Sequence, residues 1–179
     1  MIDVSAFKKA MGRFPSGVVI ATTVDGAGRP WGFTASSFSS VSLDPPLILV
    51  CPAKAAECHA AFIAATVFSI NMLGSDGEAM ARRFATRGVS KFESDDVVPG
   101  EQGLPLIRSA VATLICRKFA DHDCGDHSLI VGKVQSVKLA EGGDSLVYYR
   151  QKYGCFAERP ARELGRMTAS ASSTQRARE

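Results

Sequence analysis

The chain has 179 residues, 46% hydrophobic and 22% charged, which is typical of one globular domain and argues against a disordered or fibrous protein. Its formal net charge of +3 comes from scattered lysines and arginines, so it lacks the basic patch of a nucleic-acid-binding protein. There is neither a secretory leader nor a run approaching the ~18 apolar residues of a membrane span, and the five cysteines are widely spaced, so we expect no membrane association and free thiols in a cytoplasmic protein.

The first half of the chain predicts short strands and two helices. A β-branched run ends at Val24, and the glycines of residues 25–30 then turn the chain back into a strand that begins near Trp31, which makes a hairpin. The uninterrupted apolar run 47–51 is typical of a strand that is buried on both faces. In chain order we expect a helix at 5–12, strands at 17–24 and from Trp31, a strand at 47–51, a helix at 55–65 and a strand at 67–72.

The second half predicts one helix and then longer strands. Ser75 and Glu78 have the spacing of a capping box, so a helix should start there and run to about Thr86. Residues 91–105 are acidic and contain a Pro-Gly pair, which indicates a surface loop. The remaining expected elements are strands at 110–119 and 128–139 joined by a polar turn at 120–127, and short helical or strand segments at 146–150 and 153–156.

About seven short strands with few helices favour a mainly β fold. A closed or nearly closed antiparallel barrel fits this pattern better than a doubly wound parallel sheet, which would need regular alternation of strands and helices. We expect one domain over residues 1–160. Residues 161–179 are rich in Ala, Ser, Thr and Arg and lack apolar periodicity, so we expect a disordered tail there.

A serine-rich segment between two predicted strands is the first candidate for a binding site. Residues 32–47 contain six hydroxyl side chains and end near Pro45-Pro46. Hydroxyls both donate and accept hydrogen bonds, and turn amides can bind anions, so the segment could hold the ring carbonyls, ring nitrogens and phosphate of a cofactor. It could equally be a loop whose hydroxyls cap its own backbone.

A polar cluster at 121–127 is the second candidate, because its two histidines, Cys124 and three aspartates are competent metal ligands. Its spacing matches no zinc pattern, and a hairpin tip centred on Gly125 explains the same residues as turn chemistry. We therefore predict no metal site. The chain also has neither the G-x-S-x-G of a hydrolase nor the G-x-G-x-x-G of a Rossmann nucleotide site.

Three blocks together resemble the short-chain flavin reductase family, the reductase components of two-component flavin-dependent monooxygenases. They are FKKAMGRFPSG at 7–17 followed by VVIATT, TASSFSSVSLDPPL at 34–47, and HDCGDHSLIVGKV at 122–134. The resemblance covers roughly residues 5–157. It implies an FMN-binding split barrel, a homodimer with sites near the subunit interface, and hydride transfer from NADH or NADPH to FMN or FAD. Reduced flavin would then pass to a partner monooxygenase; the alternative is a flavin carrier or sensor without nicotinamide turnover.

The resemblance also implies which residues contact the cofactors. Those against the flavin ring and ribityl chain are Thr34, Ala35, Ser36 and Ser37, with Ser42 close by. Those that present backbone groups to the pyrimidine edge of the ring are Val50, Cys51 and Pro52. Those near the phosphate or the ring are Phe84, Ala85, Lys91 and Phe92. A hydroxyl of Thr34 or Ser36 would stabilise the charge that arrives with the hydride, and His127 matches the histidine that faces the nicotinamide.

One position departs from the family pattern. Relatives often carry hydroxyl residues that bind the flavin phosphate after the strand ending at Cys51, whereas this chain has Ala56 and Cys58 there. Lys54 could bind the phosphate as a point charge, or it could be a solvated lysine and the flavin could bind more loosely.

Overall fold

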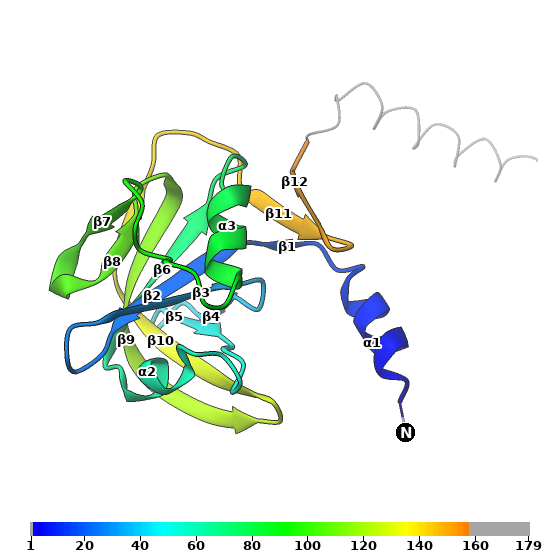
Figure 1. Cartoon of the computed structure of the whole chain (residues 1–179), viewed down its shortest axis with the longest axis horizontal. Coiled ribbons are helices and arrows are strands. Elements are labelled where there is room, and N and C mark those ends of the chain that lie inside the picture. Colours follow the sequence, from blue (N-terminus) through cyan, green and yellow to red (C-terminus); the bar gives the residue numbers. More distant parts are fainter. Residues whose placement is uncertain (1, 158–179) are drawn as a thin grey trace, which may run out of the picture.

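The computed structural model describes residues 2–157; residue 1 and residues 158–179, which include the expected tail at 161–179, lie outside the described part. Its main sheet has seven strands, and every neighbouring pair is antiparallel. Their spatial order is β3 (Pro30–Ala35), β2 (Val19–Val24), β6 (Val67–Leu73), β9 (Ala110–Cys124), β10 (His127–Leu139), β5 (Leu47–Val50) and β4 (Ser39–Ser42). The sheet curves into a barrel that stays open between β3 and β4 (Figure 1). This confirms the predicted mainly β, antiparallel split barrel.

Two smaller sheets and three helices complete the described residues. One sheet contains β1 (Ser16–Gly17), β11 (Leu146–Tyr149) and β12 (Lys152–Cys155), and the other contains β7 (Val97–Pro99) and β8 (Pro105–Ile107) with a 3-10 turn, Glu101–Gly103, between them. The helices are α1 (Val4–Met11), α2 (His59–Ala64) and α3 (Glu78–Ala85). Within residues 2–157, none of the helices has the length and apolarity needed to cross a bilayer.

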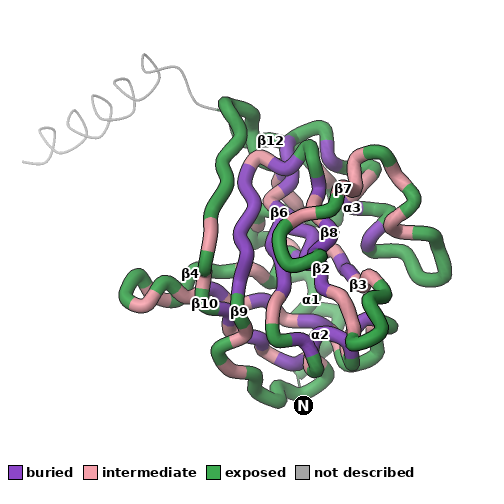
Figure 2. The backbone as a smooth tube through the Cα atoms, turned by 90° about the vertical axis from the view of Figure 1, so that its left-hand side faces the viewer, coloured by how far each residue is buried: buried purple, intermediate pink, exposed green. Residues whose placement is uncertain are grey.

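Strand β2 is buried on both faces, as is the middle of β6 (Figure 2). Val19 and Ala21 pack into the barrel core with Phe33 and other apolar residues. Val18, just before the strand, and Ile20 face the opposite way, into a second core under α3. Because strand side chains alternate between faces, this one segment contributes to both cores.

The prediction that 47–51 is buried on both faces is wrong. In β5, Ile48 and Val50 are buried, but Leu47 and Leu49 remain half-buried. The reason is what covers the second face: both strands lie beside an edge strand, but Ile20 of β2 packs into the core under α3, which includes neither Leu47 nor Leu49.

Two helix starts also differ from the predictions. The helix expected at 55–65 begins only at His59. The capping box is wrong, because α3 has Gly77 as its N-cap and no side-chain cap. Ser75 instead donates its backbone N–H to the carbonyl of Asp144, 2.8 Å away, so a tertiary hydrogen bond holds the residue that local spacing assigned to the helix.

Three loop predictions and the strand count were also inaccurate. The acidic loop 91–105 contains β7 and leads into β8, because Leu104 and Ile107 are buried in the body of the protein. The polar stretch 120–127 is mostly strand, with Gly125 at φ +63° in the turn between β9 and β10. The serine-rich segment 32–47 is not one loop either: it ends β3 and forms β4, so only residues 36–38 and 43–46 connect strands. In all, residues 2–157 form twelve strands rather than about seven.

Helix α1 stands away from the barrel (Figure 1). None of its residues is buried, and Val4, Phe7 and Met11, which lie on one face of the helix, are each more than half exposed. An eight-residue helix with no buried residue is marginal in water, so burial of this apolar face would stabilise it.

Candidate functional site

A cavity of about 390 Å³ opens where the end of β3, the segment after β5, the end of α3 and the β9–β10 turn meet. Its polar and charged wall residues come from four separate parts of the chain. The lining residues are Phe33, Thr34, Ala35, Ser36, Ser37, Cys51, Ala53, Ala56, Glu57, Cys58, Phe84, Ala85, Arg87, Lys91 and His127.

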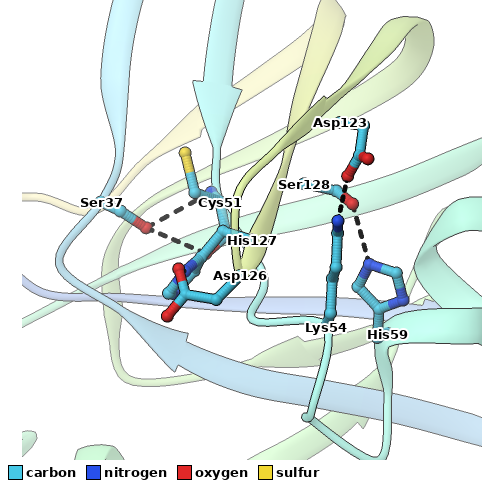
Figure 3. Close-up of polar contacts among 8 residues, drawn as sticks. All are labelled: Ser37, Cys51, Lys54, His59, Asp123, Asp126, His127 and Ser128. Atoms are coloured by element: carbon cyan, nitrogen blue, oxygen red, sulfur yellow. Dashed lines mark hydrogen bonds and ion pairs between the residues drawn. The ribbon is translucent and has the colours of Figure 1, made fainter.

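At one end of the cavity, Ser37 holds the segment that follows β5 (Figure 3). Its hydroxyl donates to the carbonyl of Cys51 and accepts from the N–H of the same residue, both at 3.3 Å. The loop 36–38 and the residue that follows β5 are thereby joined at the cavity. Burial raises the pKa of the Cys51 thiol, which keeps this wall neutral.

Helix α3 forms a second wall because it packs closely on β3. The Thr34 hydroxyl donates to the Ala81 carbonyl at 2.6 Å. Gly32 permits the approach, since a Cβ there would lie 2.8 Å from Cε1 of Phe84. The end of the helix then presents Phe84 and Ala85 to the cavity.

Two cations line the cavity beyond α3. Arg87 donates from Nη2 to the Ala55 carbonyl at 2.7 Å, and Nζ of Lys91 lies 3.5 Å from the Gly32 carbonyl oxygen. Both side chains reach the cavity wall. Because neither forms an ion pair with an acidic side chain in the described residues, their charges are available to an anionic ligand.

The β9–β10 turn carries His127 to the cavity. Nδ1 of His127 lies 2.8 Å from Oδ1 of Asp126, and this hydrogen bond lowers the pKa of the Asp126 carboxyl. The backbone around it is anchored by a bridge from His127 to Ala53 and by the Lys54 N–H, which donates to the Asp126 carbonyl at 2.9 Å. The free edge of the imidazole is therefore held at a fixed place beside the wall.

Two side-chain contacts fasten the segment after β5 to the same hairpin (Figure 3). Nζ of Lys54 forms an ion pair with Asp123. Nε2 of His59 and the Ser128 hydroxyl are hydrogen-bonded at 2.9 Å, and the Ser128 N–H donates to the Pro52 carbonyl at 3.0 Å. The segment after β5 and the β9–β10 hairpin, which form two walls of the cavity, are therefore held together.

The structure brings together most of the residues that the sequence marked. Those that line the cavity are Thr34, Ala35, Ser36, Ser37, Cys51, Phe84, Ala85, Lys91 and His127. Five others do not: Ser42 pairs with Leu47, Val50 and Pro52 are buried, Lys54 pairs with Asp123, and Phe92 packs edge-on against Phe84 at 5.2 Å. The sequence analysis missed Phe33, Ala53, Glu57 and Arg87. The sequence could have marked Arg87 as a cavity residue, because it is a cation between two marked positions, Ala85 and Lys91.

The polar cluster at 121–127 forms ion pairs and hydrogen bonds. Asp121 pairs with Lys118 at 3.1 Å, Asp123 with Lys54, and Asp126 with His127. Among residues 2–157, no three His, Cys, Asp or Glu side chains are grouped so that they could hold a metal ion.

The lining fits an elongated ligand with a flat, polar-edged ring and an anionic group. Phe33, Ala35 and Phe84 give apolar walls for a ring, and the Ser37–Cys51 end offers hydrogen-bonding groups. Arg87 and Lys91 suit a phosphate. This donor set matches a flavin mononucleotide unit.

Comparison with known proteins agrees with this reading. The model of the family described as "Flavin reductase like domain" matches residues 11–157. The chain is 40% identical over 152 residues to the FMN reductase (NADH) SmoA of Agrobacterium fabrum, covering 85% of this chain and 86% of that protein. It is 35% identical to HsaB of Rhodococcus jostii, the reductase subunit of a flavin-dependent monooxygenase, covering 85% and 77% of the two chains.

A solved structure has the same fold. SgcE6 of Streptomyces globisporus, an NADH:FAD oxidoreductase in complex with NAD and FAD fragments, superposes with a TM-score of 0.81 at 36% identity. The match covers 87% of this chain and 93% of SgcE6.

Proposed function

This chain belongs to the family of flavin reductase like domains, and we propose that it is an NAD(P)H:flavin oxidoreductase that transfers a hydride from NADH or NADPH to FMN or FAD. One observation carries the proposal: a single cavity gathers hydroxyl and backbone groups, two cations and a histidine from separate parts of the chain. The names of SmoA and SgcE6 support the same reaction.

The residues of the cavity bind and orient the two reactants. A bound flavin supplies the hydride acceptor, which is the chemistry that the side chains lack. Ser36, Ser37 and the backbone at Cys51 bind the polar edge of the ring, and Phe33 and Phe84 exclude water from its surroundings. His127 orients the nicotinamide from the hairpin side. Because hydride transfer takes no proton from a side chain, positioning is the protein's main contribution.

The phosphate is bound differently from the expectation based on Lys54. Lys54 is paired with Asp123 and does not line the cavity. Arg87 and Lys91 do line it, and neither is ion-paired in residues 2–157. We therefore assign the phosphate to these two residues, which compensate for Ala56 and Cys58 at the positions where relatives carry hydroxyls.

The reduced flavin is a product that leaves for a partner monooxygenase. The likeness to HsaB supports such a partner. Exposure of Ser36, Ser37 and Ala85 at the cavity supports a ligand that enters and leaves. We place the reaction in the cytoplasm, because all five cysteines are free thiols, and we take residues 1–160 as the catalytic domain.

The experiment is an activity matrix. Purified protein is mixed with NADH or NADPH and with FMN, FAD or riboflavin in excess over protein, and the loss of nicotinamide absorbance is followed. We expect many turnovers per protein molecule with at least one pair. If the protein stays yellow after dialysis and oxidises no nicotinamide, it is a flavin carrier or sensor and the proposal is wrong.

We also propose a homodimer, in which α1 packs on a second copy. Its face of Val4, Phe7 and Met11 is exposed, and near its base an apolar groove of about 770 Å³ runs along β11 and β12 and is lined by Tyr149, Tyr153 and Phe156. Both the groove and the helix face are apolar. In a symmetric dimer, α1 of each chain would therefore pack into the groove of the other chain.

The dimer is tested by light scattering after gel filtration. We expect the mass of two chains for the unmodified protein and of one chain for Phe7→Asp, which places a charge on the apolar face. Lys9→Asp, on the opposite side of the same helix, is the control and should remain dimeric. A single-chain mass for the unmodified protein would refute the proposal.

A further inference from the structure

A second cavity, of about 630 Å³, adjoins the proposed flavin cavity. The two share Glu57, Cys58 and Lys91 as wall residues. From this common wall, the second cavity extends between the β2–β3 turn and the segment that follows α3. Its other lining residues are Arg29, Pro30, Trp31, Gly32, Gly88, Val89, Ser90, Phe92 and Glu93.

The far wall of this cavity is a flat platform. The guanidinium carbon of Arg29 lies 4.3 Å from the centroid of the Trp31 ring. A guanidinium stacked on an indole presents a planar cationic surface, which suits a nucleobase. Stacking of bases on aromatic or guanidinium planes is tolerant of base identity and contributes strongly to affinity.

Asp25 fixes the positions of Arg29 and Trp31 by hydrogen bonds. Its Oδ2 accepts from Nε1 of Trp31 at 2.9 Å, and its Oδ1 accepts from the N–H groups of Ala27 and Arg29 at 3.0 and 2.9 Å. The hydrogen bond from Trp31 is the largest cause of the lowered pKa of Asp25. The carboxylate is therefore ionised at neutral pH, and the indole is oriented before any ligand arrives.

The charges follow a defined order along the two cavities. Ser37, Cys51 and His127 line only the first cavity, Lys91 lies in the common wall, and Arg29 lines only the second. A ligand spanning them would meet a polar ring site, then a cation, then a stacking platform. That is the covalent order of FAD: the ring system, the diphosphate and the adenosine. Glu57 and Glu93 provide acceptors for ribose hydroxyls or the adenine amino group.

We propose that the second cavity binds the adenosine diphosphate moiety of FAD, so that the protein prefers FAD to FMN. This inference rests on the proposed function, because it extends the flavin cavity. The same moiety occurs in NADH, but His127, on the nicotinamide side, lines only the first cavity. The continuity through Lys91 therefore assigns the second cavity to the flavin.

The test measures flavin binding without any nicotinamide, by the change in flavin fluorescence. We expect the unmodified protein to bind FAD about tenfold more tightly than FMN. Arg29→Ala should weaken FAD binding about five- to tenfold and leave FMN binding unchanged. Arg29→Lys keeps the charge but loses the planar group, so it should weaken FAD binding nearly as much. Arg117→Ala, an exposed arginine on β9 outside both cavities, is the matched control.

Three results would overturn the inference. One is equal affinity of the unmodified protein for FAD and FMN, and another is full FAD affinity in Arg29→Lys. The third is an unchanged FAD affinity in Arg29→Ala with a raised KM for NADH when FMN is the flavin, which would assign the cavity to NADH. Failure of the proposed function looks different, since FAD would be preferred in binding while no flavin supports NADH oxidation.

Discussion

Thr34 and Ser37 are both hydroxyl residues at the cavity, but their hydroxyls act on different partners. The Thr34 hydroxyl donates its proton to the Ala81 carbonyl at 2.6 Å, so it fastens α3 to β3 and cannot also donate to a flavin. The Ser37 hydroxyl makes two longer contacts of 3.3 Å with the backbone of Cys51. Of the two donors expected from the sequence, Thr34 or Ser36, we therefore retain only the exposed Ser36.

His127→Ala tests the role of the histidine. The ring is held by Asp126 on one side and reaches the cavity wall. We expect the KM for NADH or NADPH to rise about tenfold and the KM for flavin to change less than twofold, because the side chain positions the nicotinamide. His122→Ala, an exposed histidine outside the cavity, should leave both constants unchanged. A larger rise in the flavin KM would reject this placement.

Cysteine labelling tests burial at single residues. Burial raises the pKa of the Cys116 thiol to about 12, and only the thiolate reacts rapidly with alkylating reagents. At pH 8 we expect iodoacetamide to label the exposed Cys124 and Cys155 in the native protein but not Cys116. Excess FMN should slow the labelling of Cys51, which mass spectrometry of the peptides would detect. Equal labelling of Cys51 with and without FMN would argue against flavin in this cavity.

At the scale of elements, the segment from the end of β5 to His59 at the start of α2 and the β9–β10 hairpin form one support for the site. His59 and Ser128 join them by a side-chain hydrogen bond, and Lys54 and Asp123 by an ion pair. The ion pair is exposed, with 39% and 78% of the two side chains accessible. Exposed pairs contribute little to stability, so this one can be broken without loss of the fold.

Asp123→Asn should release Lys54 toward the flavin phosphate. We expect FMN affinity to rise about two- to fivefold, while riboflavin affinity stays the same because riboflavin has no phosphate. Adding Lys54→Ala to this variant should remove the gain. Asp121→Asn, whose partner is Lys118 rather than Lys54, is the control. An equal gain for riboflavin would show that the effect is not electrostatic.

At the scale of the whole molecule, Asn71 on β6 connects four strands. It is fully buried. Its amide nitrogen donates to the Ile20 carbonyl on β2 at 3.1 Å, and its oxygen accepts from the Ile107 N–H on β8 at 3.0 Å and from the Thr113 hydroxyl on β9 at 3.4 Å. The β7–β8 hairpin is thereby attached to the centre of the barrel.

Asn71→Ala should lower the free energy of unfolding by about 2–4 kcal/mol, because it leaves several buried groups without partners. Urea denaturation followed by circular dichroism would measure the change. Gln135→Ala removes an exposed amide from β10 and should change stability by less than about 0.5 kcal/mol. A loss below about 1 kcal/mol in Asn71→Ala would mean that the network is dispensable.

Some of this organisation follows from local sequence. The β-branched run before Val24 and the glycines after it determine a hairpin, because backbone preference and turn chemistry act over a few residues. The strands around 67–72 and 110–139 were predictable for the same reason. The match of three motifs to one family marked most of the residues that line the cavity.

Only the tertiary structure decided the remainder. It placed Ser75 in a hydrogen bond with Asp144 instead of a helix cap, engaged Lys54 with Asp123, and brought Arg87 and Lys91 to the cavity wall, where we propose that they bind the phosphate. It also brought the segment after α3, residues 88–93, against Arg29 and Trp31 to form the second cavity. The physical reason is common to all of these cases. The sequence alone determined each residue's chemistry and local backbone preference, but a charge or hydroxyl binds whichever partner the folded chain brings within reach.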